Sequence, residues 1–419
     1  MKLKLTFVIL LQFVTIAVAE DPSAVERAVV ESKQPITPSF YNGVIHLSDL
    51  STSATAGGAM YTINAPGRYY VANDLGIAPS NSRVAAIKIT VSNVFLDMNE
   101  ATIYQRTGNS QTGLMGIEIT NYASNVTIVN GKINGLNVSD TTEQNAGVVV
   151  GSGTYNITIE DVMVFGCESD ADEVAGFLLS SCENVKLVNC QANNNTNTKS
   201  GASGSNGTVN GFKLSSCSCC VLQGCYANRN HSTDQNSYGI RLVSSTYNKI
   251  LNCMALNQIS NSNTSGINVV GFYSTGGRGN LFDGCESIGN QYNGVSATST
   301  GAGFVLAGSE AGSTIRKNLA QANIGGSGLG YGISIGASVG NCCVQDNLAF
   351  YNTGTTGVGI IDAGATNVMY ISNFAHSNTT GVTVDNYSGA IGEISTATHT
   401  VYTNLDAART GYNNLEIAG

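Results

Sequence analysis

Gly211-Phe212-Lys213-Leu214 is one copy of a pattern that returns along most of the chain. Each copy has a glycine, an apolar residue, a variable residue and, in most copies, a second apolar residue. Other copies begin at Gly116, Gly147, Gly176, Gly239, Gly271, Gly303 and Gly332. Self-similarity with a period of roughly 30 residues is typical of repeat proteins, in which each repeat packs only on its neighbours. We therefore expect one elongated solenoid.

Each repeat also contains two short alternations of apolar and polar residues, joined by a bend. They can be aligned on a reference column that is Cys or Asn in most repeats: Asn99, Gly131, Val162, Cys190, Cys225, Cys253, Cys285, Asn318, Asn347 and Asn373. Alternation with period two predicts β-strands. Asn189 and Gly224, directly before the column, suit a bend that needs an unusual backbone angle. Ten coils stacked at about 4.8 Å predict a rod on the order of 45 to 50 Å long.

The cysteines of the reference column are open to two interpretations. They are either metal or redox groups, or buried side chains in a thiol ladder that continues as an amide ladder. We favour the ladder, because zinc sites use a CxxC knuckle and these thiols come one per coil. Stacked neighbours do meet the Cα separation of a disulfide, and Cys182 with Cys217 is another plausible pair. A second row is expected to satisfy turn backbone groups: Asn195, Asn230, Asn290, Asn323, Asn352 and Asn378.

These features resemble the right-handed parallel β-helix of the pectin lyase-like superfamily. The segment Gly67-Arg68-Tyr69-Tyr70-Val71, followed by Ile87-Lys88-Ile89 and Val94-Phe95-Leu96-Asp97, is similar to the usual beginning of such domains. The resemblance covers roughly residues 60–380 and implies an all-β, single-stranded right-handed parallel β-helix of about ten coils. It does not fix an activity, because the superfamily includes lyases, hydrolases, epimerases, phage tail spikes and adhesins.

The two ends of the chain depart from the repeat. Residues 1–19 combine Lys2 and Lys4 with an apolar run and a small-residue cleavage site before Glu20, which predicts a cleavable signal peptide. We expect residues 20–60 to form an N-terminal cap region, with a short helix within 23–32, residues 61–380 the β-helix, and residues 381–419 a C-terminal cap or irregular tail. The protein is then secreted or located at the cell surface.

Composition narrows the possible partners. The chain carries a formal net charge of −9 and only 11% charged residues. Binding to nucleic acid or an anionic membrane surface is therefore not expected. No stretch after the signal peptide reaches the 18 or more apolar residues of a membrane span.

Any catalytic residues are expected on the strand that begins with glycine, because enzymes of the resembled superfamily hold their substrate along its outer face. Its outward residues are expected to be Lys88, Glu118, Val149, Leu178, Lys213, Arg241, Tyr273, Val305 and Ser334. No two carboxylates are adjacent in this row, whereas an ordinary glycosidase needs two, about 5 to 9.5 Å apart. The polygalacturonase-like signatures Asn-Thr-Asp, Asp-Asp and Gly-His-Gly and the epimerase signature Asp-Pro-His are also absent from the sequence.

The alternative is a calcium-dependent polysaccharide (uronate) lyase. Such an enzyme needs oxygen ligands for the calcium that bridges a uronate carboxylate, and a base for the neighbouring proton. Glu168, Asp170 and Asp172 are the candidate calcium ligands, and Arg241 or Lys213 the candidate base. Tyr273 and Glu118 are candidate substrate-binding residues, with Tyr273 stacking on a sugar.

A third surface is suited to a partner. Large apolar side chains directly follow the reference column at Tyr226, Met254, Leu319, Leu348 and Phe374, where alternation predicts outward exposure. Either the tail after Val382 covers this row, or the row mediates adhesion or a homo-oligomer such as a trimer. Our leading hypothesis is a carbohydrate-associated binding, adhesive or structural protein without conventional catalysis, whose partner is a polysaccharide or cell-surface glycan.

Overall fold

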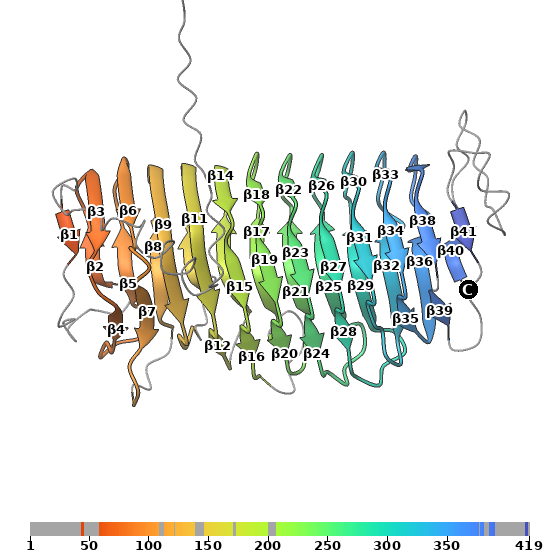
Figure 1. The fold of residues 1–419 in the computed structure, drawn as a ribbon, viewed down its shortest axis with the longest axis horizontal. Helices are drawn as coiled ribbons and strands as arrows, with labels where there is room; N and C mark the ends of the chain where they lie inside the picture. The colour runs from red at the N-terminus through yellow and green to blue at the C-terminus, as the bar shows by residue number, and fades with distance from the viewer. Residues whose placement is uncertain are drawn as a thin grey trace, which may run out of the picture. The chain divides into compact units, whose positions relative to one another are not determined.

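The computed structural model describes residues 43–45, 58–108, 113–120, 122–138, 146–170, 173–199, 207–376, 378–380, 385–389 and 415–417. All regular elements in these ranges are β-strands, and all paired strands run parallel. Figure 1 shows successive coils side by side along one axis. The expected all-β solenoid of about ten coils is confirmed. Within the described part of the chain, no helix is long and apolar enough to cross a membrane.

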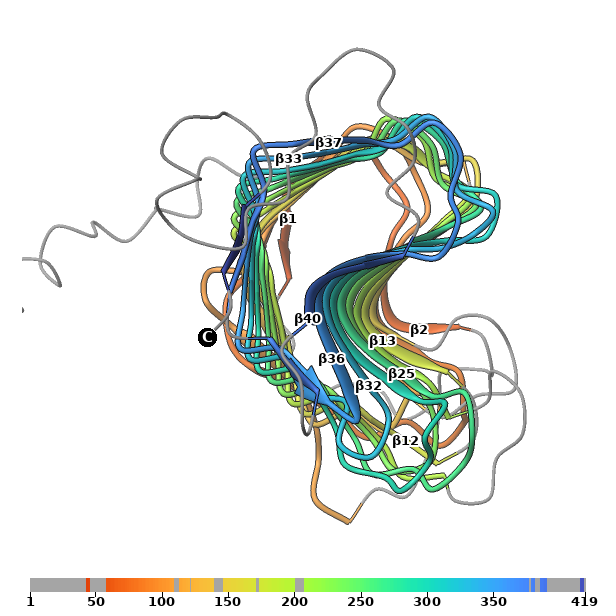
Figure 2. The same cartoon turned by 90° about the vertical axis from the view of Figure 1, so that its right-hand side faces the viewer.

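One sheet of twelve strands runs the length of the solenoid, and we call it the concave sheet. Its strands are β2 (Ala59–Ile63), β5 (Ala85–Ile89), β8 (Met115–Ile119), β10 (Ala146–Val150), β13 (Val174–Ser180), β17 (Val209–Ser215), β21 (Ser237–Val243), β25 (Asn268–Thr275), β29 (Thr300–Ala307), β32 (Leu329–Ile335), β36 (Thr356–Asp362) and β40 (Asp385–Gly389). Seen along the axis, this sheet bows toward the interior of the coil, so that its outer face is concave (Figure 2).

A second sheet of 22 strands, the outer sheet, forms the other walls of the coil. Its strands are β1 (Gly43–Ile45), β3 (Gly67–Val71), β4 (Leu75–Ile77), β6 (Val94–Asp97), β7 (Thr102–Gln105), β9 (Ser124–Asn134), β11 (Tyr155–Phe165), β14 (Glu183–Val188), β15 (Gln191–Asn193), β18 (Val221–Gln223), β19 (Tyr226–Asn228), β22 (Lys249–Leu251), β23 (Met254–Leu256), β26 (Leu281–Asp283), β27 (Glu286–Ile288), β30 (Thr314–Arg316), β31 (Leu319–Gln321), β33 (Cys343–Gln345), β34 (Leu348–Phe350), β37 (Met369–Ile371), β38 (Phe374–His376) and β41 (Leu415–Ile417).

Two small sheets line the turn before the concave sheet. The first contains β12 (Glu168–Ser169), β16 (Thr196–Asn197), β20 (His231–Ser232), β24 (Ile259–Ser260) and β28 (Gln291–Tyr292), and the second contains β35 (Thr353–Gly354) and β39 (Thr379–Thr380).

The repeated glycine creates the bow of the concave sheet. A Cβ atom on Gly176 would lie 2.7 Å from the Cβ of Ala192, and one on Gly239 would lie 2.6 Å from that of Ala255. The glycines therefore face inward, where the concave sheet touches the opposite wall, and a larger side chain would force the two walls apart. The small residues two places after the reference column are the other half of this contact.

The reference column is a buried ladder, as expected. Cys190, Cys225, Cys253 and Cys285 occupy equivalent positions in adjacent coils, because the residues that follow them pair strand to strand. The thiol of Cys285 donates to the carbonyl of Ile250 at 3.3 Å, and the amide of Asn318, one coil later, donates to the equivalent carbonyl of Phe282 at 3.1 Å. The thiol and the amide thus donate to backbone carbonyls at equivalent positions in successive coils.

The second amide row is also buried and continuous. Asn195 donates to Asn230 at 2.9 Å, and Asn230 donates to Gln258 at 3.0 Å. Further along, Asn323 donates to Asn352 at 2.8 Å. Gln258 fills the place in this row where the sequence has no Asn, so the ladder is longer than the run of asparagines indicated.

The alignment of the first coil was wrong. Leu96 does pair with Ile128, but Ile103, not Ala101, pairs with Ile133. The turn after Asp97 is two residues longer than in the next coil, and it places Asn99 in solvent with φ 51°. The buried Met98 fills the space beside Gly131 instead, since a Cβ on Gly131 would lie 2.8 Å from the Met98 side chain.

The ends of the chain are described only in part. The signal peptide and the short helix expected within 23–32 lie outside the described residues. In the tail, β40 continues the concave sheet, and β41 pairs with β38, with Leu415 opposite Phe374. These two segments of residues 381–419 therefore extend the sheets by one strand each.

Candidate functional site

The outward row of the concave sheet lies in the predicted order. Strand pairing aligns Lys88, Glu118, Val149, Leu178, Lys213, Arg241, Tyr273, Val305 and Ser334. A second row on the same face, three residues earlier in each strand, includes Asn210, Tyr238, Val270, Ala302 and Tyr331. This second row was not predicted, because the glycine and the residue after it both face the core and interrupt the alternation.

The face is divided into two apolar parts by a polar centre. Ala85, Met115, Ala146, Val149, Ala175 and Leu178 form one cluster, and Tyr238, Val270, Ala302, Tyr331 and Val358 form another. Val149 is only 1% exposed although it points outward. Side chains on a concave surface converge and cover one another, so this face is less open than the sequence suggested. Lys213 and Arg241 lie between the two clusters, and their side chains are 19% and 17% exposed to solvent.

Glu173, immediately before β13, organises the polar centre. Its carboxylate accepts hydrogen bonds from Lys213, from Arg241 Nη1 at 2.6 Å and from Asn210 at 2.8 Å. Two cations therefore share one carboxylate, which leaves a local excess of one positive charge. Arg241 Nε and Asn210 Oδ1 have no hydrogen-bond partner among the residues that the structure describes.

The electrostatics of Glu173 follow from this arrangement. Burial raises the pKa of the Glu173 carboxyl, but the charges of Lys213 and Arg241 and the hydrogen bonds from Lys213 and Asn210 outweigh burial, so the pKa lies below its usual value. Glu173 is therefore an anion at neutral pH and is a poor candidate for a general acid.

Aromatic rings adjoin the cations. The guanidinium of Arg241 lies over the ring of Tyr238, 4.7 Å from its centre, and Tyr238 lies 5.0 Å from the ring of Tyr273 at an angle of 42°. Burial raises the pKa of the Tyr238 hydroxyl, which is therefore protonated at neutral pH. We call Glu173, Asn210, Lys213, Tyr238, Arg241 and Tyr273 the central patch.

The structure brings some predicted site residues together and separates others. Arg241, Lys213 and Tyr273 belong to the central patch. Glu118 does not, because three strand steps, roughly 14 Å, lie between it and Lys213. Glu118 instead lies 3.0 Å from the ammonium of Lys88 and is 6% exposed.

The predicted calcium ligands are only partly described. Glu168 and Asp170 are exposed in and after β12, and Asp172 lies outside the described residues. Among the described side chains, the one group of three ligands close enough to share a metal ion lies elsewhere, at Cys182, Cys217 and Cys220. The calcium site therefore stays a prediction.

The apolar row on the outer sheet has the expected register. Tyr226, Met254, Leu319, Leu348 and Phe374 follow one another from β19 to β38, with Glu286 between Met254 and Leu319. Leu348 is 42% exposed, and the other members are partly buried. The row faces outward as predicted, and its role as a partner surface stays a prediction.

Sequence reasoning missed Glu173, Asn210 and Tyr238 as members of the site. Glu173 belongs to the acidic segment 168–173, whose earlier members are the predicted calcium ligands. The available signal was its position directly before Val174, which pairs with Val209 and so places Glu173 at the edge of the strand next to Lys213.

No protein-family model and no curated protein matches the chain. Among solved structures, the periplasmic alginate epimerase AlgG is similar, with 11% identity and a TM-score of 0.54 over 91% of this chain and 80% of that protein. Two others are PfbA, a surface adhesin of Streptococcus pneumoniae (14% identity, TM-score 0.40, 80% of this chain and 87% of that one), and the A-module of the Azotobacter vinelandii mannuronan C-5 epimerase AlgE4 (15%, 0.42, 73% and 87%). At this identity, the similarity to AlgG concerns the fold.

Proposed function

We propose that this chain, a right-handed parallel β-helix of the pectin lyase-like type, is a carbohydrate-binding protein that holds an acidic glycan at its central patch. One observation carries the proposal: Lys213 and Arg241 share the single carboxylate of Glu173 beside Tyr273, so the patch has an excess cation next to an aromatic ring. An acidic sugar presents the matching groups, a carboxylate and an apolar ring face.

The chemistry of the patch supports recognition. An arginine guanidinium is a rigid donor suited to carboxylates, and charge-assisted hydrogen bonds are roughly twice as strong as neutral ones. The half-buried position of Lys213 and Arg241 strengthens such bonds, because the neighbouring apolar clusters lower the local dielectric. The net negative charge of the whole chain opposes long-range attraction, so binding depends on close contact.

The arrangement is less suited to catalysis. A lyase needs a group that takes a proton from carbon, yet Lys213 and Arg241 both donate hydrogen bonds to Glu173. A hydrolase needs two carboxylates about 5 to 9.5 Å apart. Glu118 and Glu173, two carboxylates of this face, are each paired with a cation and belong to different parts of the sheet.

The test compares binding and turnover in one set of proteins. Purified wild type is run through gels that contain an acidic or a neutral polysaccharide, and the retardation is compared with that of Arg241→Ala, Tyr273→Ala and the control Lys249→Ala. Lys249 is an exposed cation on β22 of the outer sheet, far from the patch in the coil. We expect the acidic polymer alone to retard wild type and Lys249→Ala, and both patch variants to lose at least tenfold in affinity.

Two results would oppose the proposal. Equal retardation of all four proteins would show that the central patch does not bind the polysaccharide. Appearance of the ultraviolet absorbance of unsaturated uronates in the presence of calcium, lost in Arg241→Ala, would instead establish the lyase alternative.

A further inference from the structure

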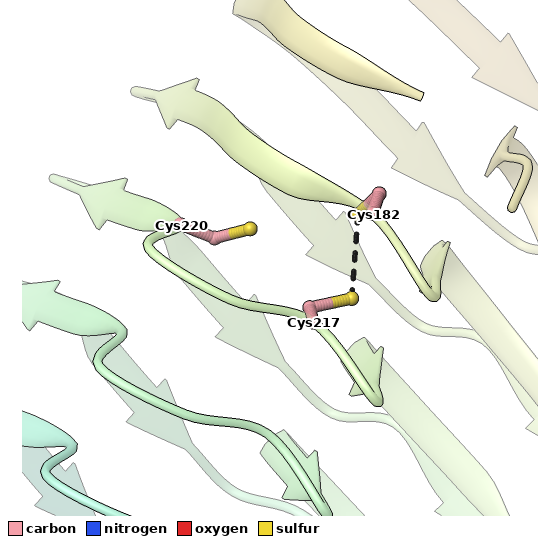
Figure 3. Close-up of side chains that lie close together, drawn as sticks. All are labelled: Cys182, Cys217 and Cys220. Carbon is pink, nitrogen blue, oxygen red and sulfur yellow. Dashed lines mark hydrogen bonds between the residues drawn. The ribbon is translucent and has the colours of Figure 1, made fainter. Parts of the chain in front are cut away.

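Three sulfur atoms meet at the turn that follows the concave sheet. Cys182 comes after β13, Cys217 after β17, and Cys220 directly before β18. The Sγ atoms of Cys182 and Cys217 are 3.3 Å apart, and all three sulfurs lie within 4.8 Å of one another (Figure 3). All three side chains are at most 3% exposed.

Cys182 and Cys217 belong to adjacent coils at the same position. The pairing of Ser180 with Ser215 and of Glu183 with Ser218 places them opposite each other across one strand spacing. That spacing, about 4.8 Å, lies within the Cα separation that a disulfide spans. Bond formation requires the two sulfurs to approach by about 1.3 Å, from 3.3 Å to the usual bond length.

A metal ion fits this cluster less well. Three thiolates around a monovalent or divalent cation would leave a net negative charge in the core, and burying an uncompensated charge is strongly unfavourable. Structural zinc sites also require a fourth ligand, and the group of potential ligands among the described residues contains three. A disulfide is neutral and requires only two of the three sulfurs.

We propose that Cys182 and Cys217 form a disulfide between the coils of β13 and β17, with Cys220 as a neighbouring exchange thiol. The reaction is a two-step exchange with an external disulfide of the glutathione or thiol-oxidoreductase class. The Cys217 thiolate attacks one sulfur of the external disulfide and releases one thiol. The Cys182 sulfur then displaces the second thiol, so two protein thiols are oxidised and one external disulfide is reduced to two thiols.

Once the coils of β13 and β17 have paired, and before the next coil is added, hydrogen bonds within the cluster favour this order. Hydrogen bonds from Cys182 and Cys220 to the Cys217 sulfur lower the pKa of Cys217, whereas the bond to Cys217 raises that of Cys182. Because the sulfurs are buried in the folded protein, the exchange belongs to folding, before the next coil covers them. The signal peptide expected at residues 1–19 would bring the chain to a compartment where such exchange occurs.

The four thiols of the reference column are a natural comparison. Cys253, for example, donates to the carbonyls of Leu251 at 3.3 Å and Leu222 at 3.5 Å, and Cys285 donates to two carbonyls in the same way. Cys217 also donates to two carbonyls, Leu179 O at 3.3 Å and Ser215 O at 3.4 Å, so the feature that distinguishes it is the 3.3 Å contact of its sulfur with that of Cys182.

The test is a disulfide map of protein refolded with reduced and oxidised glutathione. Thiols are alkylated under denaturing conditions, the chain is cut with trypsin, and the peptides are identified by mass. Cleavage after Lys132, Lys186, Lys213 and Arg229 gives peptide 133–186, with Cys167 and Cys182, and peptide 214–229, with Cys217, Cys219, Cys220 and Cys225. Fragment masses within each peptide then identify which cysteines are linked and which are alkylated. We expect these peptides to be linked before reduction, with nine of the eleven cysteines alkylated.

Variants assign the bond. Cys182→Ala should abolish the link and yield a Cys217–Cys220 disulfide within peptide 214–229, whereas Cys253→Ser should leave the link intact. Eleven alkylated thiols in refolded wild type would refute the proposal, as would a link at Cys190 and Cys225. Stoichiometric metal released when the protein is denatured, with all thiols reduced, would identify a metal site instead. The wild-type map decides the question even if Cys182→Ala fails to fold.

Discussion

The contact between the glycine row and the opposite wall predicts a strong effect from one added methyl group. In Gly147→Ala, the new Cβ would lie 2.5 Å from Val164 Cγ1 and 3.3 Å from Cγ2. Carbon atoms pack at about 3.5 to 4.0 Å, so the walls must separate by roughly 1 Å. Overpacking of this kind lowers the free energy of unfolding by about 1 to 3 kcal/mol. Alanine also restricts the unfolded backbone more than glycine does, which raises the free energy of unfolding by about 0.4 to 1 kcal/mol. The midpoints of these two ranges give a net loss of about 1.3 kcal/mol.

A second substitution separates this steric cause from a backbone effect. Val164→Ala alone should destabilise the fold by about 2 kcal/mol, because it removes buried methyl groups. In the Gly147→Ala background the same change removes the clash, and the nearest remaining atom is Gly176 O at 3.2 Å. The double variant should therefore be more stable than the sum of the two single effects by at least about 1 kcal/mol.

Urea unfolding followed by far-ultraviolet circular dichroism measures these differences, since the chain has no tryptophan to report by fluorescence. Gly340→Ala is the control, because a Cβ there would have its nearest neighbour at 3.4 Å, an ordinary contact. Equal stability of Gly147→Ala and Gly340→Ala, or strictly additive effects of Gly147→Ala and Val164→Ala, would refute the steric explanation of the glycine row.

The remaining predictions concern the patch, the ladder and the outer row. The lowered pKa of Glu173 contributes stability above the carboxyl's unfolded pKa of about 4.3, and this contribution disappears as the pH falls through the folded pKa. Glu173→Gln should therefore be less stable than wild type at pH 7 and nearly equal to it in acid, in pH-dependent urea unfolding; a constant difference would contradict this. Asn347→Ala should cost at least about 3 kcal/mol in the same assay, since Asn347 bonds to Ile315 O and to Asn318 and Asn373 in the core, whereas Gln321→Ala should change little. If the apolar row joins subunits, light scattering should find wild type oligomeric and Leu348→Lys monomeric, and a monomeric wild type would exclude a homo-oligomer at this surface.

The repeat predicted the fold because each column has to satisfy the same contacts in every coil. The residue that faces Ala192 must be glycine. The residue in the reference column, such as Cys285 or Asn318, must donate a hydrogen bond to a carbonyl of the preceding coil. Such constraints recur about ten times, so the register of the concave sheet could be read from the sequence. The first coil was misaligned because its longer turn after Asp97 replaced a column residue with Met98, and one coil provides no repetition to reveal the change.

The site was less predictable than the fold, because the relevant contacts occur once. Arg241 and Lys213 were recognised by their outward position, but their shared bond to Glu173 depends on a side chain that reaches across two coils from a turn. The spacing of Cys217 and Cys220 is a CxxC motif, and its proximity to Cys182 follows from the register. The sequence indicated Cys182 with Cys217 as a plausible pair, but Cys220 was not recognised as their neighbour.

The buried amide rows give the solenoid an electrical direction. Asn318 donates to Asn347 and Asn347 to Asn373, and in the other row Asn290 donates to Asn323 and Asn323 to Asn352, so the side-chain dipoles of these asparagines have the same sense along the axis. Aligned dipoles polarise one another, which makes the two ends of the rod chemically different. Removing or duplicating one whole coil preserves this alignment, whereas a cut within a coil breaks it. Evolution can thus change the length of this protein in whole-coil steps while the polarity of the rod is retained.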